Sequence, residues 1–146
     1  WARSSWQYPD TGYHINDYYY ALQHFSRFVQ PGYRRVPASS TAAGVLASAY
    51  YDAHSARLVM VLLNTSGSGT ATPTLAFDFP WSEHGEVYRS TFSNATERFA
   101  FLGSLGAGNQ VTLPPQAVAT VVIEGVGRPP RRGHAPGHVA SGPPAH

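Results

Sequence analysis

The stretch Asp17-Tyr-Tyr-Tyr-Ala-Leu-Gln-His-Phe-Ser-Arg-Phe-Val29 carries the clearest secondary-structure signal in the chain. Apolar side chains recur in it at spacings of four, three and four residues, which would place them on one face of a helix. Asn16 suits the N-cap, because its short side chain can accept a bond from an unpaired N–H of the first turn. Pro31-Gly32 would end the helix, since proline cannot donate the next helical bond and glycine tolerates a left-handed turn. We therefore predict one amphipathic helix over residues 17–29, with a buried face formed by Tyr18, Leu22, Phe25 and Val29. Ala21 and Phe28 widen this stripe, and His24 falls on the other side.

After this helix, residues 43–125 have the periodicity of β-strands. The run from Arg57 to Asn64 is almost wholly apolar, as in a central strand that is covered on both faces. Leu75, Phe77 and Phe79 alternate with other residues, which predicts a half-buried strand. Seven short strands separated by Gly, Pro, Ser and Asn turns predict an antiparallel β-sandwich, with strands at 44–52, 57–64, 75–79, 86–92, 98–102, 110–113 and 117–124.

The chain divides into three regions: residues 1–36 with the helix, the sandwich at 37–125, and a tail at 126–146. The tail is rich in Pro, Gly, Arg and His, and we predict it to be disordered because it cannot bury enough apolar area. It also carries the excess positive charge, since residues 1–125 hold seven Arg against eight acids and the tail holds three Arg and no acid. We therefore expect no nucleic-acid partner for the body. No run is long enough for a membrane span.

Two residue types are missing from the composition. The chain has no Cys, which excludes thiol catalysis, cysteine zinc sites and disulfide frameworks. It also has no Lys, which excludes the P-loop lysine and Schiff-base chemistry. We accordingly predict no cofactor.

The helix and its end resemble a known family. The run from Tyr19 to Tyr33, Tyr-Tyr-Ala-Leu-Gln-His-Phe-Ser-Arg-Phe-Val-Gln-Pro-Gly-Tyr, is similar to the segment that closes the catalytic TIM barrel in glycoside hydrolase family 30. This family includes endo-β-1,6-galactanases, xylanases and glucosylceramidases. Runs at 58–64, 88–91 and 111–121 resemble the β-sandwich that follows the barrel, in the same order.

The resemblance covers roughly residues 6–125, and several expectations follow from it. It implies the last barrel helix and most of the sandwich of a secreted, retaining enzyme that hydrolyses β-linked polysaccharide. In the family the two catalytic glutamates lie on earlier barrel strands, so no residue here is assigned a catalytic role. The barrel and strands from the N-terminal end of the family's chain would complete the fold. Because the chain starts at Trp1 with no signal peptide, we interpret it as a fragment or a processed piece.

Three aromatic residues before the helix, Trp1, Trp6 and Tyr8, are candidates for substrate binding. Their flat rings suit the C–H faces of sugars, and the resemblance would place them on the barrel rim, where active sites lie. The alternative is that they pack against the helix or against the missing part of the barrel.

Carboxylates and histidines give weaker signals. Glu83 and Glu86 are the only closely spaced glutamates, but a retaining pair needs carboxyl groups about 5–5.5 Å apart, and a solvated turn is the better interpretation. His134 and His138 have the spacing of metal ligands on a helix, yet Pro136-Gly137 lies between them, so we predict no metal site.

Two sequons, at Asn64 and Asn94, fit Asn-x-Ser/Thr and fall at predicted strand ends, where a glycan would have room. We name both as candidate glycosylation sites. They agree with a secreted protein.

Two other functions remain open at this point. The chain could be a free-standing carbohydrate-binding β-sandwich without catalysis, which would need a planar row of exposed aromatics drawn from Tyr50, Tyr51, Trp81, Tyr88 and Phe92. It could also be a purely structural or interaction domain that a partner completes.

Overall fold

The computed structural model describes residues 16–81, 84–93, 97–106 and 108–127. Within them the chain forms one helix and six strands. These are α1 (Asp17–Ser26), β1 (Arg34–Val36), β2 (Val45–Asp52), β3 (Arg57–Asn64), β4 (Gly85–Thr91), β5 (Ala100–Ser104) and β6 (Ala117–Ile123). The prediction of a mainly-β, antiparallel fold preceded by one helix is confirmed.

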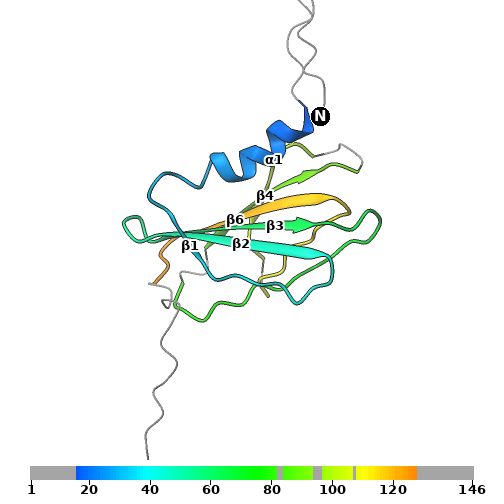
Figure 1. The fold of residues 1–146 in the computed structure, drawn as a ribbon. Helices are drawn as coiled ribbons and strands as arrows, with labels where there is room; N and C mark the ends of the chain where they lie inside the picture. The colour runs from blue at the N-terminus through cyan, green and yellow to red at the C-terminus, as the bar shows by residue number, and fades with distance from the viewer. Residues whose placement is uncertain (1–15, 82–83, 94–96, 107, 128–146) are drawn as a thin grey trace, which may run out of the picture.

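The six strands form one sheet in the order β1-β2-β3-β6-β4-β5, and every neighbouring pair is antiparallel. β3 and β6 occupy the centre, because their apolar side chains can be buried on both faces of the sheet. Figure 1 shows α1 lying across one face of this sheet, with the long connecting segments across the other.

The face opposite α1 carries the larger core. Val45, Leu62 and Ile123 of the sheet pack there with Leu75 and Leu113 from the connecting segments. These segments touch each other only through isolated bridges, Ala71 with Leu113 and Thr74 with Gln110, instead of the continuous strands expected at 75–79 and 110–113. Prolines explain this, since Pro73, Pro80, Pro114 and Pro115 lack the N–H that a strand ladder needs.

The helix begins as predicted, with the Asn16 side chain accepting from the Tyr19 amide at 3.3 Å. It ends at Ser26, three residues before the predicted end, where Phe28 and Val29 close a tight turn onto the Phe25 carbonyl. Gly32 follows with a φ of +100°, a conformation that favours glycine.

The prediction of which helix face is buried is wrong. Tyr18, Leu22 and Phe25 are 67%, 66% and 39% exposed, and of the expected stripe only Val29 and, at its margin, Phe28 pack against the sheet side. His24, which was expected on the other side, is fully buried and docks the helix together with Phe28. They lie four residues apart and so share a face. The sheet below meets His24 with hydroxyl groups, which an apolar side chain could not satisfy.

Candidate functional site: the exposed apolar surface around α1

Large apolar side chains are exposed mainly on one side of the sheet. Leu46 lies on the same face of β2 as Tyr50, whose ring is 6.3 Å from that of Phe25 in α1. Phe101 of β5 lies 5.2 Å from Tyr88, which in turn contacts Phe28. We call the exposed set on this side the α1-side surface; it comprises Tyr18, Tyr19, Leu22, Phe25, Leu46 and Phe101. Clusters of this kind mark places where a protein meets another surface.

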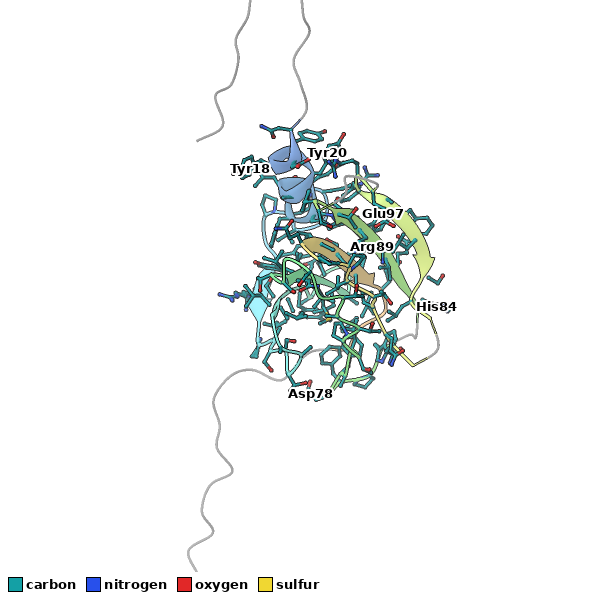
Figure 2. The ribbon with its side chains drawn as sticks, turned by 90° about the vertical axis from the view of Figure 1, so that its right-hand side faces the viewer. Tyr18, Tyr20, Asp78, His84, Arg89 and Glu97 are labelled. Carbon is teal, nitrogen blue, oxygen red and sulfur yellow. The ribbon has the colours of Figure 1, made fainter. Side chains whose placement is uncertain are left out.

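The start of α1 is fixed to the sheet by Arg98. Its guanidinium lies 2.8 Å from the Asp17 carboxylate and 5.5 Å from the centre of the Tyr20 ring, and it also donates to the Thr91 carbonyl. Figure 2 shows Tyr18 and Tyr20 at this end of the molecule, where α1 begins. The exposed residues of α1 are therefore presented on a helix that is held at both ends.

The last turn of α1 is held by a buried polar network around His24. Thr120 Oγ1 donates to the His24 carbonyl at 3.0 Å, so the same oxygen accepts from His24 Nδ1 at 2.8 Å. Nε2 then accepts from Ser90 Oγ at 2.9 Å, and Ser90 Oγ accepts from the Phe99 amide at 2.8 Å. The geometry thus selects the neutral imidazole with its hydrogen on Nδ1.

A hydroxyl beside a histidine can also be a nucleophile and its base, but His24 is not placed for that chemistry. The side chain is fully buried, as is Ser90, so no substrate can reach either group. Burial lowers the pKa of the His24 imidazole from 6.5 to about 4. The network is a structural one that joins α1 to β4 and β6.

Five of the six carboxylates in the described residues have separate partners. Asp17 pairs with Arg98, Glu97 with Arg89 and Glu124 with Arg57, while Asp52 accepts from Ser55 and Glu86 accepts from Tyr88. The Arg89 pair is bidentate, with both distances 2.6 Å, and this hydrogen bonding lowers the pKa of Glu97. Figure 2 marks Arg89 and Glu97 on the same side of the molecule.

The candidate pair Glu83 and Glu86 cannot be measured as a pair, because Glu83 lies outside the described residues. Glu86 is exposed as the second residue of β4, not in a turn. In the part of the chain that the structure describes, no group of three or more His, Asp or Glu side chains could hold a metal ion. His134 and His138 are beyond that part.

The aromatic row expected of a carbohydrate-binding module is not formed. Tyr51 and Trp81 belong to the core on the face opposite α1. Tyr88 and Phe92 pack on the α1 side, as does Tyr50 through Phe25. Since the five rings are split between the two faces of the sheet, they cannot line one sugar chain together.

Of the candidate site residues, Trp1, Trp6, Tyr8 and Asn94 lie outside the described residues. Asn64 is described, and the expectation that a glycan would have room there is wrong. It ends β3 as predicted, but it is 1% exposed. Its amide nitrogen, the atom that would carry the glycan, donates to the carbonyls of Gly69, Leu113 and Pro114 at 2.7–3.0 Å.

Sequence reasoning did not single out His24, Ser90 and Thr120 as a group. Thr120 is 96 residues from His24 along the chain and Ser90 is 66, so no local spacing connects them. The one available signal was His24 itself, a polar residue one helical turn before Phe28.

The chain can be compared with proteins of known family and known structure. No protein-family model matches the chain, and no curated protein sequence does. Solved structures do match, and they include a family 30 endoxylanase from Clostridium papyrosolvens C71 and a family 30 subfamily 8 xylanase from Clostridium acetobutylicum. Each has a TM-score of 0.61 and 25% sequence identity over 73% of this chain. The resemblance to glycoside hydrolase family 30 is confirmed.

The likeness to family 30 has a definite extent. The matched region covers 27% of the length of each xylanase, so this chain corresponds to about a quarter of those proteins. No helix among the described residues is long and apolar enough to cross a membrane.

Proposed function

We propose that this chain is the C-terminal β-sandwich portion of a secreted, retaining glycoside hydrolase that acts on β-linked polysaccharide. In this proposal α1 is the last helix of the catalytic barrel, and the catalytic glutamates belong to the barrel and not to this chain. The likeness to two family 30 xylanases supports the enzyme class.

The observation that carries the proposal is that α1 has large apolar side chains on an exposed face as well as on its docked face. The helix docks on the sheet through His24 and Phe28, yet it leaves Tyr18, Leu22 and Phe25 exposed. A helix of an isolated domain normally has one apolar stripe facing its own core. Two apolar faces fit a helix that lies between two bodies, with the sandwich on one side and the barrel on the other.

The substrate would be met by the barrel and by the residues before α1. Trp1, Trp6 and Tyr8 precede the helix, on the side of the chain where the barrel would lie, and we propose that they stack on sugar rings at its rim. Asn94 is the sequon that we retain as a glycosylation site, because the Asn64 amide is buried.

Hydrolysis assays on two proteins test this proposal. The chain of residues 1–146 is compared with a protein extended by the sequence encoded upstream of it, on xylan, β-1,6-galactan and β-glucan. We expect release of reducing sugar by the extended protein only. Hydrolysis by residues 1–146 alone, or an upstream sequence that encodes no barrel with two strand-end glutamates, would overturn the proposal. Millimolar or tighter binding of these sugars by the chain alone would favour a carbohydrate-binding module.

The interface with the barrel can be tested separately with Leu22→Gln. In the extended protein this change is expected to cost about 2–3 kcal/mol of unfolding free energy, because a buried leucine side chain is replaced by an amide. In the isolated chain, where Leu22 is 66% exposed, it should cost less than about 0.5 kcal/mol.

Leu102→Gln is the matched control, since Leu102 is also exposed but lies in β5, at the irregularity opposite Val87 and Tyr88, and not on the helix. It should cost little in both proteins. Equal, small losses for Leu22→Gln and Leu102→Gln in the extended protein would show that the barrel does not cover α1.

A further inference from the structure

The polar network at the last turn of α1 is fully satisfied only while His24 is neutral. Nε2 has to accept the Ser90 hydroxyl hydrogen, because the single imidazole hydrogen is on Nδ1 and is donated to Thr120 Oγ1. A second hydrogen on the imidazole would turn Nε2 into a donor facing Ser90 Oγ. The Ser90 hydroxyl hydrogen would then lose its acceptor inside a buried site.

The surroundings of His24 supply no counter-ion among the described residues. Its hydrogen-bond partners there are hydroxyl groups, and its ring lies 4.9 Å from the ring of Phe99. The Arg27 guanidinium lies 5.4 Å from the centre of the same Phe99 ring, so the charged group that this ring also contacts is a cation and not an acid.

The acids on α1 and on the strands and segments around His24 each interact with another group. On α1 and the segment before β5 these are Asp17 with Arg98 and Glu97 with Arg89; on β4 and after β6 they are Glu86 with Tyr88 and Glu124 with Arg57. None of these pairs includes His24. Moving a carboxylate to His24 would break an existing contact.

We propose that His24 is an acid-sensitive latch, so that protonation of its imidazole releases α1 from the sheet while the sheet itself stays folded. The face opposite α1 keeps the larger core, including Leu58, Leu62, Leu113 and Ile123, which does not depend on the helix. The α1 face loses the contacts of Phe28 and its neighbours, together with those of Arg98 with Asp17 and Tyr20. This inference does not depend on the proposed enzyme function.

The direction of the effect follows from proton linkage. A released imidazole has a pKa near 6.5, and burial lowers the pKa of the docked one to about 4. The released helix therefore binds a proton that the docked helix does not bind, and release becomes easier as pH falls from 6.5 toward 4. With these values the equilibrium for release should shift about thirtyfold between pH 8 and pH 5.

Amide hydrogen exchange of residues 1–146, corrected for intrinsic rates, tests the latch. Protection of the α1 amides should fall about thirtyfold from pH 8 to pH 5, while amides of β3 and β6 stay protected. His24→Gln, which can keep a donor and an acceptor without titrating, should remove this pH dependence. His54→Gln, at an exposed turn, is the control and should retain it.

Two results would overturn the proposal. One is a parallel loss of protection in α1, β3 and β6, which would mean that the whole fold opens together. The other is an unchanged pH dependence in His24→Gln. If that variant does not fold, the imidazole nitrogen signals of the wild-type chain decide instead. A docked His24 should titrate near pH 4, and titration near pH 6.5 would remove the coupling and overturn the proposal.

Discussion

Replacing Phe28 with alanine is expected to lower the free energy of unfolding by about 3–5 kcal/mol, the largest loss that we expect from any residue around α1. The Phe28 ring is 9% exposed and packs on four valines of the two central strands, Val59, Val61, Val118 and Val122. Its ring centre also lies 4.8 Å from that of Tyr88 and 5.8 Å from that of Phe99. Truncation would leave a cavity that this rigid sheet cannot close.

Phe25→Ala is the matched control for this prediction. Phe25 lies less than one turn before Phe28, it is 39% exposed, and its ring packs edge-on against that of Tyr50. Its truncation should cost about 1 kcal/mol or less in the isolated chain. Urea unfolding of the wild type and both variants measures the difference. Equal losses, or a larger loss for Phe25→Ala, would mean that the helix docks through the face expected from the sequence pattern.

The comparison of these two residues shows why the helix could be predicted but its orientation could not. Apolar spacing identified α1 and Asn16 identified its start, since both signals are local. However, α1 has apolar residues on two sides, and the longer stripe of Tyr18, Leu22 and Phe25 is the exposed one. The choice between them depends on Ser90 and Thr120, which lie far away in the sequence.

The strands also differ in whether local sequence or distant residues determine them. β2, β3, β4 and β6 begin and end within one residue of the predicted positions, because their apolar runs need burial on a sheet. The segment around Leu75 and Phe77 alternates like a strand but forms only isolated bridges. β1 was not predicted, since Arg34-Arg35-Val36 has no strand pattern of its own and is ordered by pairing with β2.

Changing Asn64 to aspartate should be almost as destabilising as truncating Phe28, although asparagine and aspartate have nearly the same shape. We expect a loss of about 3 kcal/mol or more at pH 7. The Asn64 amide donates to three carbonyl oxygens, and a carboxylate would bring negative charge within hydrogen-bond distance of all three. The side chain is 1% exposed, so water cannot compensate.

The pH dependence of this loss has a definite sign. Burial beside three carbonyls would raise the pKa of the new carboxyl group above that of an exposed aspartate, so the folded variant binds a proton more readily than the unfolded one. The penalty relative to the wild type should therefore shrink as pH falls, because a protonated acid can again donate one bond. Taking the difference from the wild type at each pH removes the contribution of His24, which is common to both proteins.

Gln30→Glu separates the effect of burial from that of the amide-to-acid change itself. The Gln30 amide also donates to two carbonyls, those of Ser26 and Arg27, but it lies on the exposed surface at the end of α1. Water can solvate a carboxylate there, so the cost should stay below about 1 kcal/mol. Similar losses at Asn64 and Gln30 would show that the Asn64 side chain is accessible in solution, and Asn64 would then return as a position with room for a glycan.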